Sequence, residues 1–218
     1  MKNNTQIFGP IIEPTSGVIN NIVLFLHGYG ANGEDLINIG EHWKKNIPNT
    51  IFYSPNAPFT CDINPNGFQW FPLNKRTEDE LKEGLQKASP FLEKFTLNIL
   101  EKHSLKLSDL IVVGFSQGTI LSLYNFTTKK APIGGLIGYS GLFYNDEKED
   151  ESKINFPILL HHGEDDEIIS SNFTKKAEDI LIKRGFNVES VIKKNLGHGI
   201  DQNGLELGEK FIRNVLKL

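Results

Sequence analysis

The chain has 218 residues, 39% hydrophobic and 23% charged, which are proportions typical of a globular protein with one large core. Its formal net charge of −4 disfavours a role in binding nucleic acid or an anionic membrane surface. The single cysteine, Cys61, cannot form an internal disulfide and fits a reducing compartment. Residues 1–6 lead to no apolar segment of a signal peptide, and the longest apolar run, residues 22–26, is too short to cross a bilayer. We therefore expect a cytoplasmic protein without stable membrane insertion.

Strand patterns alternate with helical patterns along the whole chain. In order, short apolar or β-branched runs predict strands at residues 7–12, 22–26, 50–54, 110–113, 133–139, 157–161 and 187–193. Helical periodicity predicts helices at residues 34–45, 77–103, 119–126, 171–184 and 205–216. This alternation predicts an α/β fold with a mostly parallel central sheet and helices on both faces. We expect one domain over residues 1–218.

Two longer segments show no clear period and are expected to be loops. Residues 145–153 are strongly polar. Residues 59–76 hold large apolar side chains among Asn, Pro and Gly, which indicates an aromatic loop rather than a linker. Its large apolar residues include Phe59, Phe68, Trp70, Phe71 and Leu73.

The sequence Gly114-Phe115-Ser116-Gln117-Gly118 lies between a predicted strand and a predicted helix. A chain that turns from strand to helix within a few residues crowds the positions beside the apex, so only glycine fits there. The pattern Gly-x-Ser-x-Gly is weak alone, but this context favours a serine nucleophile at Ser116.

A serine nucleophile needs a histidine that removes its proton and a carboxylate that orients the histidine. In chains with a serine turn of this type, the acid lies between the serine and the histidine. That order disfavours the three histidines before Ser116, which are His27, His42 and His103. His161 and His162 end a predicted strand and follow only the acids of a charged loop. His198, in a glycine-flanked loop after the last strand, is the best candidate for the base.

Residues 164–167 are four consecutive carboxylates, and any one of them turned inward would complete a triad. The residues alone leave the choice open, because such a run is usually a solvated loop. The two histidines before the run raise a metal site as an alternative. No HExxH spacing or cysteine ligand set accompanies them, so we expect no metal.

Gly28, Gly30 and Gly33 spell G-x-G-x-x-G between a predicted strand and a predicted helix, which raises dinucleotide binding as an alternative. That function requires an acidic residue at the end of the next strand, and residues 52–56 contain none. Nucleotide binding is therefore disfavoured.

A glycine-containing loop in this position can instead supply a backbone N–H to an oxyanion hole, with a second N–H from the residue after the nucleophile. Those donors would be Tyr29 and Gln117. A tight helix entry without a catalytic role remains the alternative for these glycines.

Several segments together resemble the phospholipase/carboxylesterase family of α/β-hydrolases, which includes the acyl-protein thioesterases. They are residues 26–36 (LHGYGANGEDL), 114–118 (GFSQG), 162–166 (HGEDD) and 196–199 (LGHG), joined by Gln69-Trp70-Phe71. The resemblance runs from about residue 22 to the C-terminus and implies an α/β-hydrolase fold.

The resemblance also implies roles for individual residues. The family pattern His-Gly-x-x-Asp falls on His162, Gly163 and Asp166, which makes Asp166 the acid of the triad. It implies the same oxyanion donors, Tyr29 and Gln117, and a loop near Trp70 beside the acyl pocket. Two positions depart from many members, which have an acidic residue where this chain has Pro72 and a proline where it has Ser170. These departures put the substrate preference in doubt, but not catalysis.

The expected function is therefore a serine hydrolase that cleaves carboxylic esters or thioesters through an acyl-enzyme formed on Ser116, with His198 as base and Asp166 as acid. Phe68, Trp70, Phe71 and Leu73 are candidates to line an acyl groove, although buried rings that pin the loop to the core are an equal alternative. We expect no cofactor, no nucleic-acid partner, and a small-molecule or acylated substrate. Alternatives are a lysophospholipase or small-ester esterase without a protein substrate, and a catalytically silent lipid- or partner-binding protein.

Overall fold

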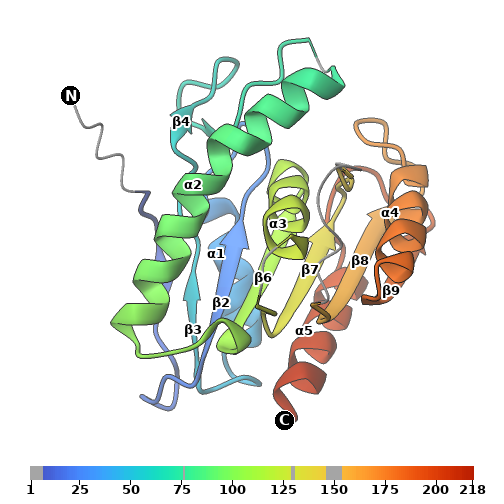
Figure 1. The fold of residues 1–218 in the computed structure, drawn as a ribbon. Helices are drawn as coiled ribbons and strands as arrows, with labels where there is room; N and C mark the ends of the chain where they lie inside the picture. The colour runs from blue at the N-terminus through green and yellow to red at the C-terminus, as the bar shows by residue number, and fades with distance from the viewer. Residues whose placement is uncertain (1–6, 76, 129–130, 146–153) are drawn as a thin grey trace.

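The computed structural model describes residues 7–75, 77–128, 131–145 and 154–218, and its helices and strands alternate along the chain (Figure 1). The strands are β1 (Ile11–Ile12), β2 (Asn21–Leu26), β3 (Thr50–Tyr53), β4 (Phe59–Thr60), β5 (Phe68–Gln69), β6 (Leu110–Phe115), β7 (Gly135–Tyr139), β8 (Pro157–Gly163) and β9 (Asn187–Lys193). The helices are α1 (Gly33–Trp43), α2 (Glu78–Lys102), the short 3₁₀ helix η1 (Leu107–Asp109), α3 (Gln117–Thr127), α4 (Asn172–Lys183) and α5 (Gln202–Leu216).

Seven strands form one sheet in the order β1-β3-β2-β6-β7-β8-β9. β1 pairs antiparallel with β3 at one edge, and all the other neighbours in this sheet are parallel. In this register Leu24 lies beside Val112, and Val113 lies beside Ile137. The carboxyl ends of the parallel strands therefore lie side by side at one end of the sheet, the upper end in Figure 1. The mostly parallel α/β sheet predicted from the sequence is confirmed.

Helices cover both faces of the sheet, and the alternation of side chains along β2 shows why its sequence is apolar throughout. Ile22, Leu24 and Leu26 belong to the core under α2, α3 and α4. Val23 and Phe25 belong to the core on the opposite face, under α1 and α5. Figure 1 shows the first group of helices in front of the sheet and the second behind it. A strand buried on both faces reads as a continuous apolar run, which is the signal that the sequence carries.

The main differences from the sequence expectations are small elements and element ends. The strand expected at residues 7–12 is reduced to β1, because Pro10 has no N–H for a ladder. The aromatic loop contains the hairpin of β4 and β5, whose two-residue strands are too short to show a period. Helix α3 begins at Gln117 rather than two residues later, because Ser116 is its N-cap residue. The polar loop expected at residues 145–153 lies, apart from its first residue, outside the described residues, as do residues 1–6 and Arg76.

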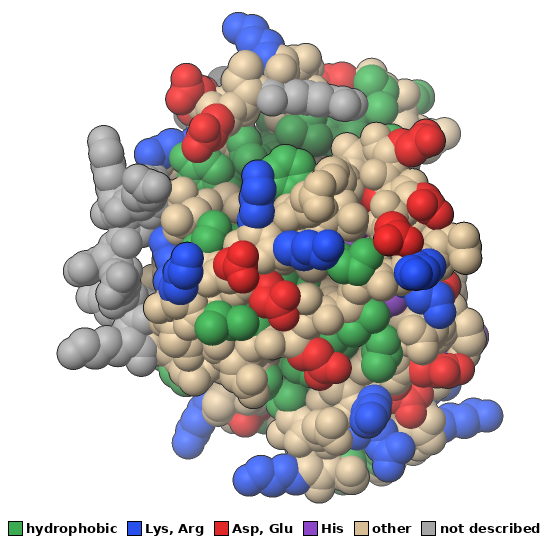
Figure 2. Space-filling model, turned by 90° about the vertical axis from the view of Figure 1, so that its right-hand side faces the viewer, with side chains coloured by type: hydrophobic (Ala, Val, Ile, Leu, Met, Phe, Trp, Pro, Cys, Tyr) green, Lys and Arg blue, Asp and Glu red, His purple; other side chains and the backbone are tan. Residues whose placement is uncertain are grey.

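Figure 2 shows the side of the molecule that carries α4 and β9, where acidic and basic side chains are mixed and hydrophobic side chains lie in small groups. Among the residues that the structure describes, no helix is both long and apolar enough to cross a membrane.

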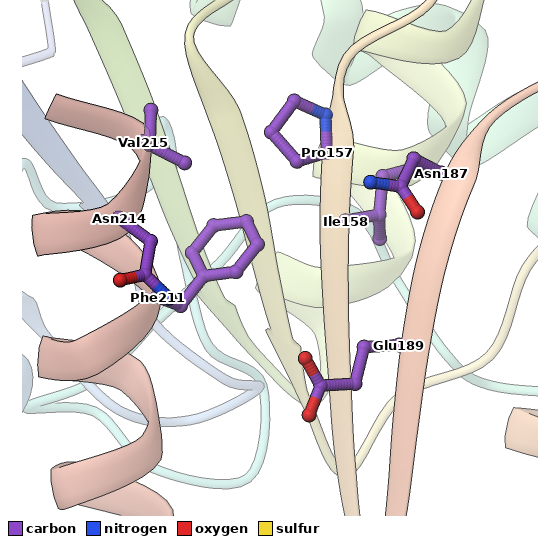
Figure 3. A pocket seen from close by; sticks show the side chains of 7 residues that line it. All are labelled: Pro157, Ile158, Asn187, Glu189, Phe211, Asn214 and Val215. Atoms are coloured by element: carbon purple, nitrogen blue, oxygen red, sulfur yellow. The ribbon is translucent and has the colours of Figure 1, made fainter. Parts of the chain in front are cut away.

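A hollow of about 260 Å³ lies between α5 and the first residues of β8 and β9 (Figure 3). It is lined by Pro157, Ile158, Asn187, Glu189, Phe211, Asn214 and Val215. Because β8 and β9 begin here, the hollow lies at the edge of the sheet opposite their carboxyl ends.

Candidate active site

Ser116 stands at a sharp turn between the end of β6 and the start of α3. Its backbone has φ +52° and ψ −116°, a conformation that costs about 1–3 kcal/mol in a residue with a side chain. The two glycines of the motif make this turn possible. A Cβ on Gly118 would overlap the carbonyl oxygen of Leu26, and a Cβ on Gly114 would lie 2.6 Å from the amide of Thr119. The crowding predicted from the motif is therefore present on both sides of the serine.

His198 and Asp166 lie in contact at the end of the sheet where the parallel strands have their carboxyl ends. The Nδ1 atom of His198 is 2.7 Å from Oδ2 of Asp166. The imidazole ring packs against Phe115, the residue before Ser116, with the ring centroids 5.0 Å apart. The structure thus brings the predicted acid and base together beside the serine turn.

Asp166 is the only buried member of the four-carboxylate run, with 8% of its surface exposed. One oxygen, Oδ1, accepts the amide N–H groups of Ile168 and Ile169, both at 2.9 Å. Burial opposes the charged carboxylate, but the hydrogen bonds from Ile169, His198 and Ile168 together outweigh it. They lower the pKa of Asp166 below its ordinary value, so the carboxylate is ionised and able to orient the imidazole.

The loop that was predicted to supply an oxyanion donor passes close to the serine. A Cβ on Gly28 would lie 3.3 Å from the Cβ of Ser116, which places the next residue, Tyr29, at the rim of the serine turn. Gln117 is the first residue of α3, so its amide N–H is one of the helix donors that have no intrahelical acceptor. Both predicted oxyanion donors therefore belong to the backbone that surrounds Ser116.

The side chain of Gln117 joins the serine turn to the aromatic loop. Its Oε1 accepts the N–H of Trp70 at 2.9 Å, and its Nε2 donates to the carbonyl of Phe71 at 2.7 Å. Trp70 and Phe71 are fully buried in the core, whereas Phe68 and Leu73 are half-buried and pack against it. Of the four residues considered for the acyl groove, only Phe68 and Leu73 therefore offer side-chain surface to a substrate in this structure.

The histidines next to the acid do not form a metal site with it. His161 and His162 both lie in β8 and are fully buried. Within residues 7–75, 77–128, 131–145 and 154–218, no group of three or more His, Cys, Asp or Glu side chains is arranged to hold a metal ion.

Comparison with known proteins agrees with this arrangement of the sheet and its helices. A sequence profile described as Phospholipase/Carboxylesterase matches residues 9–216, nearly the whole chain. The chain belongs to the phospholipase/carboxylesterase family. This membership and the parallel sheet with helices on both faces make the fold that of an α/β-hydrolase.

The matches to individual members of the family extend over most of this chain. The acyl-protein thioesterase 1 homolog 1 of Dictyostelium discoideum is 29% identical over 203 residues, which are 89% of this chain and 90% of the relative. Esterase YpfH of Escherichia coli is 26% identical over 208 residues, 94% of this chain and 88% of the relative. The crystal structure of esterase PE8 superposes with a TM-score of 0.92 at 35% identity, covering 96% of this chain and 99% of that chain.

In this member of the family, the sequence motifs did not predict the contacts that two buried side chains make with the aromatic loop and its neighbours. The motifs assigned only a backbone role to Gln117 and none to His27. The carbonyl of His27 accepts the indole N–H of Trp70 at 2.9 Å, and its ring accepts the N–H of Ala57 at 2.9 Å. Burial lowers the pKa of His27, so this ring is neutral at neutral pH. No sequence pattern marks these contacts, because their partners are 30 and 43 residues away.

Proposed function

We propose that the protein is a serine hydrolase that cleaves carboxylic esters or thioesters through an acyl-enzyme formed on Ser116. The observation that carries this proposal is the 2.7 Å contact between His198 and Asp166 beside the serine turn. Family membership and the similarity to proteins named as esterases and acyl-protein thioesterases support the same chemistry.

In the first half of the reaction, Oγ of Ser116 attacks the carbonyl carbon and its proton passes to Nε2 of His198. Asp166 accepts the hydrogen bond from Nδ1 and stabilises the imidazolium as it forms. The amides of Tyr29 and Gln117 donate to the oxyanion, and one such donor contributes about 3–4 kcal/mol to transition-state stabilisation. The leaving alcohol or thiol then takes the proton from His198 as its bond to carbon breaks.

In the second half, water attacks the acyl group on Ser116 and His198 acts again as base and then as acid. No cofactor takes part in these steps. We propose that Phe68 and Leu73, which are only half-buried, contact the acyl chain.

Ser116→Ala tests the mechanism in a hydrolysis assay with a short-chain aryl ester. We expect kcat/KM to fall by more than about 10³-fold, because the nucleophile is lost while the fold is kept. Activity within tenfold of the parent protein would contradict the mechanism, and a parent protein without activity would favour a silent binding protein.

The leaving group and acyl chain require a separate test. We propose that the substrate is a small or acylated ester or thioester rather than a nucleic acid, acted on in the cytoplasm, where the unpaired Cys61 stays reduced. Turnover of a palmitoylated peptide, a lysophospholipid and a butyrate ester should be compared at equal enzyme concentration. A preference for the palmitoylated peptide supports a thioesterase, and a preference for either of the others supports an esterase without a protein substrate.

A further inference from the structure

His162 is a buried histidine that the proposed mechanism does not use. It is adjacent to His161 in β8, and successive side chains of a strand point to opposite faces of the sheet. His162 points toward α4, where its Nδ1 is 2.7 Å from the hydroxyl of Thr174. Both side chains are buried, so these polar atoms have only protein partners nearby.

The other ring nitrogen of His162 contacts two acceptors. Nε2 lies 2.8 Å from the carbonyl oxygen of Ile169 and 3.0 Å from Oδ2 of Asp166. Neither the carbonyl nor the ionised carboxylate can donate a hydrogen, so the hydrogen must be on Nε2. Nδ1 is hydrogen-bonded to the hydroxyl of Thr174. The surrounding groups thus require a hydrogen on Nε2 of His162.

Asp166 accepts three hydrogen bonds. Two come from the amides of Ile168 and Ile169 to Oδ1, and the third comes from His198 to Oδ2. His162 lies beside them in the strand β8, where its Nε2 is bonded to the carbonyl of Ile169 and is 3.0 Å from Oδ2 of Asp166. It therefore ties the turn that carries the carboxylate to the sheet.

The strand end also holds the loop that carries His198. The amide of Asp165 donates to the carbonyl of Leu196 at 3.0 Å, and the amide of Glu164 donates to the carbonyl of Lys193 at 2.8 Å. A Cβ on Gly163 would overlap the carbonyl oxygens of Leu196 and Gly197, so this close approach requires glycine. Residues 162–166 are thus bonded to and packed against the loop that carries His198, and His162 belongs to the sheet strand at the start of this segment.

We propose that His162 is a positioning residue for catalysis, which holds the carbonyl of Ile169 and lies against Oδ2 of Asp166, so that the carboxylate stays in line with Nδ1 of His198, and which is itself held by Thr174. This inference rests on the proposed function.

Two substitutions of His162 separate positioning from packing. The amide nitrogen of His162→Gln reaches about the place of Nε2 and can donate to the carbonyl of Ile169, whereas His162→Leu fills the space without a donor. For His162→Leu we expect kcat to fall by about 10–100-fold at unchanged KM, as is typical for outer partners of catalytic histidines and carboxylates. For His162→Gln we expect kcat within about fivefold of the parent. A kcat for His162→Leu within threefold of the parent, or equal kcat values for the two variants, would overturn the proposal.

Thr174→Val is a milder test with a matched control. Loss of one neutral hydrogen bond to Nδ1 should lower kcat by about two- to tenfold. Thr96→Val is the control, because Thr96 is also buried and its hydroxyl has no hydrogen-bond partner among the described residues. Equal kcat values for these two valine variants would count against the role of Thr174.

Nitrogen-15 NMR of the imidazole groups tests the hydrogen on Nε2 in the parent protein, so it does not depend on a variant that folds. We expect His162 to carry a hydrogen on Nε2, because this atom faces the carbonyl of Ile169 and Oδ2 of Asp166. An Nε2 without a hydrogen would overturn the proposal. Ester hydrolysis by the parent and its loss in Ser116→Ala test the proposed function separately, so failure of either idea can be recognised on its own.

Discussion

Replacement of Gln117 by methionine tests how the aromatic loop is held against the serine turn. Gln117 has 1% of its surface exposed, and its amide group makes two hydrogen bonds to the backbone of Trp70 and Phe71. Methionine has nearly the same volume and helix propensity but cannot make either bond. The substitution therefore leaves one N–H and one carbonyl buried without a partner, while the backbone amide of residue 117 stays in place.

The expected loss of stability follows from the two backbone groups that are left without a hydrogen-bond partner. A buried backbone donor or acceptor without a partner costs about 1–3 kcal/mol, so the free energy of unfolding should fall by about 2–6 kcal/mol. For a chain of this size, the smaller value corresponds to a loss of at least about 4 °C in Tm. This exceeds the effect of most surface substitutions, which stay within about 0.5 kcal/mol.

Urea unfolding of the parent and Gln117→Met, followed by tryptophan fluorescence, measures this difference. Gln86→Met is the matched control, because Gln86 is exposed in the interior of α2 and the same change should alter stability by less than about 0.5 kcal/mol. Equal stabilities of the Gln117 and Gln86 variants would refute the conclusion that the Gln117 side chain holds the loop.

Three further predictions follow from the site and the core. Asp166→Asn should keep the fold but lower kcat by roughly 10⁴-fold, because the amide favours the wrong tautomer of the base, and a loss below tenfold in steady-state assays would contradict this. Burial lowers the pKa values of His27 and His161, so only the unfolded chain takes up these protons as pH falls below about 6.5. Stability in urea should therefore fall from pH 7.5 to 5.5, by up to about 1.4 kcal/mol per pH unit for each histidine, and an unchanged midpoint would be the opposing result. Gly118→Ala should lower Tm strongly, because its Cβ would overlap a β2 carbonyl oxygen, whereas Gly199→Ala, where the Cβ meets open space, should leave Tm nearly unchanged in thermal unfolding.

The central strands were predictable because their burial on both faces leaves a continuous apolar run in the sequence. β2, β6 and β8 all carry this signal, and each appears where it was expected. The hairpin of β4 and β5 was not predictable, because a two-residue strand has no measurable period and its pairing depends on contacts made after folding. The prediction of a single domain over residues 1–218 stays a prediction.

At the site, too, the sequence could not predict features that depend on contacts made only after folding. The order of serine, acid and base along the chain, together with the glycine-flanked loop after the last strand, is enough to favour His198. The four neighbouring carboxylates, however, are equivalent until the turn folds. Only then do the amides of Ile168 and Ile169 point at Asp166 and distinguish it from the other three. The family resemblance supplied that choice in advance, and the role of Asp166 remains a prediction for the variants to test.

The most direct test of the account is the site of reaction with a fluorophosphonate, followed by mass spectrometry of the digested protein. An activated serine should give one adduct, on the peptide that contains Ser116, and Ser116→Ala should give none. His198→Ala should label at least about 100-fold more slowly, because the serine has lost its base. An adduct on another residue, or equal labelling rates for the parent and His198→Ala, would contradict the assignment of Ser116 as the nucleophile activated by His198.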